Sequence, residues 1–287
     1  MPADFFAEAR AREELGLAVF LNAGDPSLPV LTDLVALLDE SDVDCLELAV
    51  PFPDSPTDGP VVRRSADRAL ARGVALRETL AFVATVRPTL KRLRIAVLAD
   101  WSHSLRTVPP ADYARAVADS GADALLAHGL PPRLRSAHHE ALRSAGLPEV
   151  TTCYPASSPA TVAEAAAHAT GYLYLVARYG RSGAGSPEGG HAGLAPFVGS
   201  LRDLTASPIA VGFGVSTAED LASVALSGAD AAIVGSAGVA ALERSLEAGS
   251  DPVDGYRSFA AALGRPATVR PKEDTRAHPK HRDRQDS

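Results

Sequence analysis

One carboxylate stands inside an apolar run of the chain. The run CLELAV places Glu47 between Leu46 and Leu48, with Cys45 and Ala49 on the same face of a strand. Burial of a carboxylate there is costly unless the group is protonated, paired or used. If this face points into a site, burial raises the pKa of Glu47 and suits it to general acid-base chemistry. A structural ion pair with a neighbouring strand is the alternative interpretation.

A second carboxylate follows in an irregular segment. Asp58 lies eleven residues after Glu47 in PFPDSPTDGP, and Asp54 precedes it. Two carboxylates of unequal burial can divide acid and base roles. We therefore predict that Asp58 joins Glu47 in one pocket, whereas turn formation or helix capping is the alternative and is favoured for Asp54.

Two glycine-containing runs near the end of the chain indicate an anion site. GFGVS begins at Gly212 and VGSAGV begins at Val234, and each follows an apolar segment and precedes a helical pattern. Backbone N–H groups at helix N-termini bind anions, glycine permits close approach, and the Ser236 hydroxyl adds a donor. The runs predict a phosphate site rather than turns alone.

Several other classes of function are disfavoured. The net charge of −7 argues against a nucleic-acid partner. The histidines show no metal-ligand spacing, and GFGVST lacks the third glycine of a dinucleotide fingerprint. No leader-like start or long apolar window indicates secretion or membrane insertion. Cys45 and Cys153 are predicted to be buried thiols, and we expect a cytoplasmic protein.

Eight short apolar segments must position these residues. They cover 17–21, 43–50, 94–100, 122–128, 149–154, 171–177, 207–214 and 229–236, and Ala- and Leu-rich helical stretches separate them. This alternation predicts an α/β protein with a single (β/α)8 TIM barrel over residues 1–265, preceded by a short N-terminal helix. A doubly wound open sheet is the alternative. Residues 266–287 are charged and proline-rich, which predicts a disordered tail.

Two irregular segments follow the second and sixth predicted strands. They begin at Pro51 and Arg178 and are rich in Pro, Asp and Gly. Loops after barrel strands build the catalytic face. We expect these segments to form a rim or lid over the active site.

Five segments together resemble the tryptophan synthase alpha chain family. They are AGDPS, LELAVPFPDSPTDGP, GYLYLVARYGRSG, VGFGVS and VGSAGV, in the family's order and spacing over residues 6–246. The resemblance implies a lyase of tryptophan biosynthesis that cleaves indole-3-glycerol phosphate to indole and glyceraldehyde 3-phosphate without a metal or organic cofactor. It also implies a tryptophan synthase beta chain as a partner.

The resemblance assigns roles to individual residues. Glu47 aligns with the family's catalytic Glu, which shuttles the proton, and Asp58 aligns with the Asp that accepts a hydrogen bond from the indole N–H. The phosphate-binding positions align with Gly183, Gly212, Phe213, Gly214, Gly235 and Ser236. Tyr174 and Arg178 align with pocket residues near the mobile loop.

The chain departs from the family pattern where the substrate ring and the partner are recognised. Asp100 and Trp101 stand in a segment where the family reads Met-Tyr-x-Asn, so we place both in the substrate pocket and expect the Asp100 charge to raise a neighbouring pKa or to recognise a substrate amine. Gly129 replaces an Asp that couples the two chains, and the loop from Pro53 to Thr57 is altered. These changes weigh against a beta chain. The alternatives are a lyase for another glycerol phosphate or sugar phosphate, and a non-catalytic barrel that binds phosphate ligands and activates a partner enzyme.

Overall fold

Eight parallel strands form the centre of the molecule in a computed structural model that describes residues 4–177 and 191–268. The strands are β1 (Gly16–Asn22), β2 (Cys45–Ala49), β3 (Arg94–Asp100), β4 (Ala124–His128), β5 (Val150–Cys153), β6 (Tyr172–Val176), β7 (Ile209–Gly212) and β8 (Ala231–Val234). Each falls on one of the eight segments predicted from the sequence. Nearly continuous apolar runs are typical of parallel strands that are covered on both faces.

The strands close into a nearly complete barrel. Hydrogen-bonded neighbours follow the order β4-β3-β2-β1-β8-β7-β6-β5, and a single bridge between Leu125 and Glu149 joins β4 to β5. Strands β1 and β8 therefore pair with each other, as barrel closure requires. This confirms the predicted TIM barrel and excludes the open sheet.

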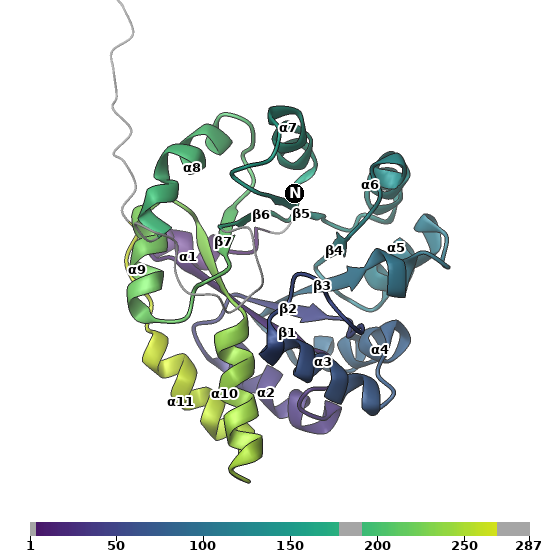
Figure 1. Cartoon of the computed structure of the whole chain (residues 1–287), viewed down its shortest axis with the longest axis vertical. Coiled ribbons are helices and arrows are strands. Elements are labelled where there is room, and N and C mark those ends of the chain that lie inside the picture. The colour runs from purple at the N-terminus through teal and green to yellow at the C-terminus, as the bar shows by residue number, and fades with distance from the viewer. Residues whose placement is uncertain (1–3, 178–190, 269–287) are drawn as a thin grey trace, which may run out of the picture.

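Helices form the outer layer around the strands (Figure 1). They are α1 (Ala7–Ala11), α2 (Leu28–Glu40), α3 (Pro60–Ala71), α4 (Leu76–Val86), η1 (Arg87–Thr89), η2 (Trp101–Leu105), α5 (Pro110–Asp119), η3 (Pro132–Leu134), α6 (Arg135–Ala145), α7 (Pro159–His168), η4 (His191–Leu194), α8 (Ala195–Arg202), α9 (Ala218–Leu226), α10 (Ser236–Glu247) and α11 (Pro252–Leu263). Thr217 is the N-cap of α9, and its side chain accepts a hydrogen bond from Asp220 N. Among the described residues, no helix is long and apolar enough to cross a membrane.

Small side chains line the interior of the barrel, and aromatic rings fill the space they leave. The fully buried interior alanines are Ala18, Ala96, Ala124, Ala210 and Ala231. Phe5 and Phe6, just before α1, pack edge-on against Tyr172 of β6 with ring centroids 5.3 and 5.6 Å apart. The N-terminal segment thus contributes to the core and supports the face of β6 that points inward.

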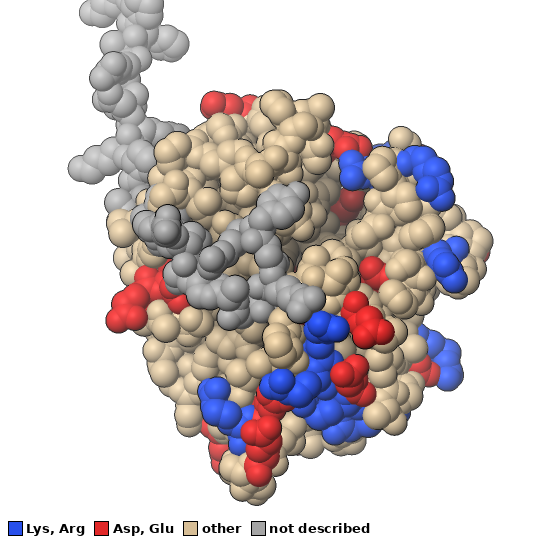
Figure 2. All heavy atoms as spheres, in the orientation of Figure 1, with Lys and Arg blue, Asp and Glu red and all other residues tan. Residues whose placement is uncertain are grey.

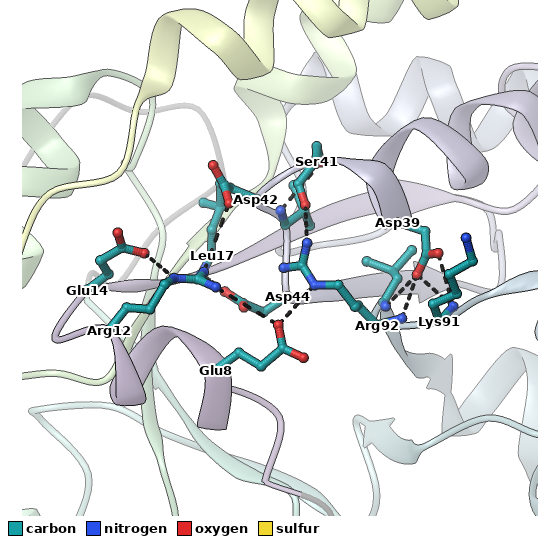
Figure 3. Close-up of polar contacts among 12 residues, drawn as sticks. Glu8, Arg12, Glu14, Leu17, Asp39, Ser41, Asp42, Asp44, Lys91 and Arg92 are labelled. Atoms are coloured by element: carbon teal, nitrogen blue, oxygen red, sulfur yellow. Dashed lines mark hydrogen bonds and ion pairs between the residues drawn. The ribbon is translucent and has the colours of Figure 1, made fainter.

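Acidic side chains organise the chain just before strands β2 and β3 (Figure 3). Asp39 accepts hydrogen bonds from three consecutive backbone N–H groups, the shortest from Leu93 at 2.7 Å. Asp44 accepts from the backbone of Leu17 and from Arg265, both at 2.8 Å. Bonds that a buried carboxylate accepts fix the loops on the side of the barrel where strands begin.

The predicted tail lies outside the described residues except for 266–268. These three residues pair with the segment before β1: Leu15 N donates to Pro266 O at 3.0 Å and Thr268 N donates to Glu13 O at 2.8 Å. On the face drawn in Figure 2, Lys and Arg atoms are interspersed with Asp and Glu atoms, and no basic surface spans that face. Cys45 and Cys153 are buried free thiols, as predicted.

Candidate active site

A cavity opens where strands of the barrel end, and most of the predicted site residues line it. Those on its wall are Glu47, Asp58, Asp100, Tyr174, Phe213, Gly214, Gly235 and Ser236. They come from β2, β3, β6 and the segments after β2, β7 and β8. The barrel therefore brings together residues that are up to 189 positions apart in the chain (236 − 47), and it does so at the face where barrel enzymes carry their chemistry.

Glu47 is the most deeply buried carboxylate of this cavity. Its side chain is 1% exposed. Oε1 accepts a hydrogen bond from the Tyr172 hydroxyl at 2.5 Å, whereas Oε2 is buried and has no hydrogen-bond partner in the described part of the chain. Burial raises the pKa of Glu47 to about 7, against the lowering effect of the Tyr172 bond. Among the described residues no cation pairs with Glu47, so the ion pair with a neighbouring strand is excluded. A carboxyl with a pKa of about 7 is able to exchange a proton near neutral pH.

Tyr172 is the partner that sequence reasoning missed. Burial and the neighbouring Glu47 charge raise the pKa of Tyr172 well above its ordinary value, so the hydroxyl stays a donor. It shares a face of β6 with Tyr174 by the period of two, which was the available signal. A tyrosine in an apolar strand also fits a core position, and only the barrel brings it to Glu47.

Asp58 lies in the loop between β2 and α3, half-buried on the cavity wall. Burial raises its pKa, and a hydrogen bond from Ser55 and the nearby His128 and Arg63 lower it by less. The neighbouring Asp54 is exposed at the loop tip with a φ of 54° and lies 3.9 Å from Arg63. The turn interpretation therefore holds for Asp54, while Asp58 faces the cavity.

Asp100 ends β3 and caps the π-helix η2 that follows it. Its side chain is 7% exposed, and Oδ1 accepts hydrogen bonds from Ser102 Oγ, His103 N and His103 Nδ1 at 2.6, 2.9 and 2.7 Å. Burial raises the pKa of Asp100, but these bonds outweigh burial and the net shift is downward. Asp100 is not among the causes of the raised pKa of Glu47 or Asp58, so our expectation that it raises a neighbouring pKa was wrong.

Tyr174 and Gly212 fit together on adjacent strands. A Cβ at Gly212 would overlap the Tyr174 ring and hydroxyl, so β7 needs glycine where the ring crosses it. Tyr174 pairs with Ala210 in the sheet register and lines the cavity. Burial raises the pKa of Tyr174 well above its ordinary value, which keeps the hydroxyl neutral.

At the predicted phosphate site, after β7 and β8, the groups available to an anion are backbone N–H groups rather than cationic side chains. Gly235 is the N-cap of α10, whose first residue is Ser236. Phe213 and Gly214 follow β7 in the left-handed region, with φ of 72° and 84°, and α9 begins only at Ala218. The described residues of the cavity wall include no Lys or Arg. An anion there would be bound by N–H groups, a hydroxyl and the dipole of α10.

Four predicted residues are not part of this described wall: Gly212, Trp101, Arg178 and Gly183. Trp101 packs against the outer layer of the core, between the sheet and the helices, and does not line the cavity. Arg178 and Gly183 lie outside the described residues. The pocket wall instead includes Phe52, whose ring stacks on His103 at 5.2 Å, and His128 at the end of β4.

One group of side chains outside this cavity has metal-ligand composition. Atoms of His139, Glu149 and His168 lie within 4.8 Å of one another, which their scattered sequence positions did not predict. The rings of His139 and His168 are parallel, with centroids 3.6 Å apart and planes 5° apart. One ion cannot lie in the planes of two parallel rings, so these histidines stack on each other rather than form a ready metal site.

The chain matches one protein family along most of its length. The family model described as tryptophan synthase alpha chain matches residues 6–263. The tryptophan synthase alpha chain of Gloeobacter violaceus is 36% identical over 232 residues, or 81% of this chain and 83% of that protein. The alpha chain of Burkholderia multivorans is 33% identical over 258 residues, or 90% and 93%.

Solved structures agree with this assignment. The tryptophan synthase alpha subunit of Legionella pneumophila superposes with a TM-score of 0.80 at 26% identity, covering 90% of this chain and 95% of that one. A Mycobacterium tuberculosis tryptophan synthase chain gives 0.78 at 28% identity, with 90% and 95% covered. With its barrel and with Glu47 and Asp58 on one cavity wall, the chain belongs to the tryptophan synthase alpha chain family, lyases of the aldolase type that cleave indole-3-glycerol phosphate to indole and glyceraldehyde 3-phosphate.

Proposed function

We propose that this cavity binds indole-3-glycerol phosphate across the barrel mouth and cleaves it with Glu47 as the proton carrier. The phosphate would bind at Phe213, Gly214, Gly235 and Ser236, after β7 and β8. Strands β3 and β4 lie four places from β7 and β8 in the ring, on the opposite side. The indole ring would therefore extend toward β3 and β4, and the glycerol chain would pass Glu47 on β2.

The observation that carries the proposal is the environment of Glu47. A carboxyl with a pKa of about 7 can both give and accept a proton near neutral pH. Tyr172 holds one oxygen and leaves Oε2 free for the substrate. Glu47 would first protonate C3 of the indole ring, and the resulting carboxylate would then remove the proton of the glycerol hydroxyl next to the ring. The C–C bond breaks with its electrons returning to the ring, the hydroxyl carbon becomes the aldehyde, and Glu47 is again protonated.

Asp58 would stabilise the charge that appears during this sequence. Protonation at C3 makes the ring nitrogen cationic and its N–H more acidic, so an acceptor at that N–H lowers the barrier. Asp58 lines the same cavity from the loop after β2, and it remains an acceptor as long as it is ionised. Two carboxylates would thus have separate tasks, one at ring carbon and one at ring nitrogen.

We also propose that the chain works with a tryptophan synthase beta chain in the cytoplasm. The family is named as one chain of a larger enzyme, and a solved neighbour is tryptophan synthase itself. Gly129 and the altered loop from Pro53 to Thr57 still predict weaker coupling than in relatives. Comparison of indole release with and without a beta chain measures that coupling.

Glu47→Gln tests the proposal because it keeps the shape of the side chain and removes its proton exchange. We expect wild type to release indole from indole-3-glycerol phosphate and Glu47→Gln to lose at least ~100-fold in kcat, as for loss of a general acid-base group. Glu149→Gln is the matched control, because Glu149 is also a buried glutamate but lies outside the cavity. Thermal unfolding of all three proteins shows whether the fold is retained.

Two outcomes would contradict the proposal. If Glu47→Gln stays within a few-fold of wild type, Glu47 does not carry the proton. If wild type is inactive both alone and with a beta chain, indole-3-glycerol phosphate is not the substrate. A different phosphorylated substrate, or a non-catalytic barrel that activates another enzyme, would then be the better account.

A further inference from the structure

Asp100 has one carboxylate oxygen, Oδ2, that accepts no hydrogen bond from the described residues. All three hydrogen bonds to its carboxylate reach Oδ1, from Ser102 and from the backbone and ring of His103. Oδ2 faces Gly129, where an added Cβ would lie 3.3 Å away. Glycine at 129 therefore leaves room beside Oδ2, and Asp100 itself lines the cavity.

The local backbone holds this carboxylate in place. Asp100 caps η2, a π-helix, which is a rare element that is frequent at functional sites. His103 of η2 bonds Oδ1 through its ring and stacks on Phe52 at 5.2 Å with planes 26° apart. Phe52 in turn stacks on His128 of β4 at 6.5 Å. Contacts from three segments thus fix the direction in which Oδ2 points.

The position of Asp100 relative to the rest of the site indicates which part of a ligand it meets. Asp100 ends β3 and pairs in register with His128 of β4, on the side of the barrel opposite the predicted phosphate end. The wall there includes the apolar side chains of Leu98, Leu126 and Phe52 together with the ring of His128. A flat apolar ring suits this wall, and an ionised oxygen at its edge suits a hydrogen-bond donor on that ring.

We propose that Asp100 is a specificity-determining residue that selects a substrate whose ring carries a hydroxyl or amino donor on its edge far from the glycerol phosphate. The inference rests on the proposed function, because it takes the ring to lie at β3 and β4. An unsubstituted ring turns a C–H toward Oδ2 and leaves this carboxylate oxygen desolvated without a donor. Sites that hydrogen-bond a substrate hydroxyl or amine discriminate strongly against analogues that lack it.

The test compares ring-substituted indole-3-glycerol phosphates. We would measure kcat/KM for the unsubstituted compound and for its hydroxy, amino and methoxy derivatives at each carbon of the six-membered ring. Methoxy matches hydroxyl in position but cannot donate. We expect wild type to prefer a hydroxy or amino derivative over its methoxy counterpart and over the parent by about 10- to 100-fold at one ring position.

Two substitutions at Asp100 sharpen the result. Asp100→Asn can keep the bonds to Ser102 and His103 through its oxygen and then turns an NH2 group toward the cavity. It should abolish the preference for donors and favour the methoxy acceptor. Asp100→Leu should abolish the preference and improve the parent compound relative to the hydroxy derivative. Asp119→Asn, an exposed Asp at the end of α5, is the matched control and should keep the wild-type ratios.

Failure of this inference is distinct from failure of the proposed function. If wild type cleaves the parent, hydroxy and methoxy compounds alike, the lyase assignment stands and selection by Asp100 is refuted. It is also refuted if both Asp100 variants keep the wild-type ratios. If no compound is cleaved, calorimetric titration with indole and hydroxyindoles decides, because a donor-selecting Asp100 requires tighter binding of one hydroxyindole to wild type than to Asp100→Asn. Equal affinities there would overturn it.

Discussion

Tyr172→Phe should shift the pH dependence of catalysis by a predictable amount. The Tyr172 hydroxyl donates to Glu47 Oε1 at 2.5 Å and stabilises the ionised carboxylate, which opposes the effect of burial. A hydrogen bond to a charged group contributes about 1.5–3 kcal/mol, and one pKa unit corresponds to about 1.4 kcal/mol. Loss of the bond should therefore raise the pKa of Glu47 from about 7 by roughly one unit or more.

The direction of the effect on rate follows from the order of proton transfers. In the proposed mechanism Glu47 begins protonated and delivers its proton to the indole ring, so kcat/KM of wild type should fall as pH rises through about 7. In Tyr172→Phe the protonated form persists to higher pH, and the falling limb should move upward by about one unit. The ring contacts of Tyr172 with Phe5 and Phe6 remain available to phenylalanine.

The assay is the initial rate of indole release at low substrate concentration over a pH range of roughly 5 to 10, since kcat/KM reports the free enzyme. Tyr256→Phe is the control, because Tyr256 of α11 is another fully buried tyrosine, packs against Gly238 of α10 and does not line the cavity. A limb that stays in place in Tyr172→Phe, or moves to lower pH, would refute the account of Glu47. A matching shift in Tyr256→Phe would assign the effect to general loosening.

Two further predictions concern stability and fit. Hydrogen bonds from Arg64 hold the pKa of Glu243 at about 2 against an ordinary 4.5, so its stabilisation is present above about pH 4.5 and is lost as pH falls toward 2. Glu243→Gln should lower the free energy of unfolding at neutral pH by about 2 kcal/mol, a value discounted because Arg64 is exposed. In urea titrations at several pH values, the free energy of unfolding of the variant should also fall less steeply with acid than that of wild type. Parallel pH dependences for the two proteins would contradict this. Gly212→Ala should force its new methyl against Tyr174, cost about 1–3 kcal/mol in stability and raise KM. Wild-type KM and urea midpoint in that variant would show that the ring has room to move.

The strands could be predicted because burial on both faces makes each one a short apolar run with clear ends. The segment 17–21 became β1 (Gly16–Asn22), and 94–100 became β3 without change. The barrel followed from the count of eight alternating units. The pattern did not predict that β4 and β5 are joined by a single bridge. The same apolar residues could equally have formed a full ladder of hydrogen bonds between these strands.

The site could be predicted only where a residue violates the pattern of its own element. Glu47 is such a residue, since burying a carboxylate in an apolar strand costs free energy unless the group is protonated, paired or functional. Tyr172 obeys the pattern of its strand and pairs with Glu47 across 125 residues, so the period of two places it on the face of Tyr174 but does not mark it as a partner of Glu47. The stack of His139 on His168 is likewise tertiary, because it joins α6 to the end of α7. The hydrogen bonds of Asp100 depend on η2, which could not be predicted because the sequence WSHSL has no periodicity that indicates a π-helix.

Three carboxylates around one cavity are kept in different states by their surroundings. Burial lifts the pKa of Glu47 to about 7, whereas Asp100 remains below its ordinary pKa because three donors on Oδ1 outweigh its burial. Asp58 lies between them in environment, half-buried and raised. Proton transfer requires a group that changes state near neutral pH, and recognition requires one that does not. In the roles proposed above, the same residue type serves as a proton carrier, a stabiliser of developing charge and a fixed acceptor. Exchanging these roles would require different hydrogen-bond donors around each carboxylate.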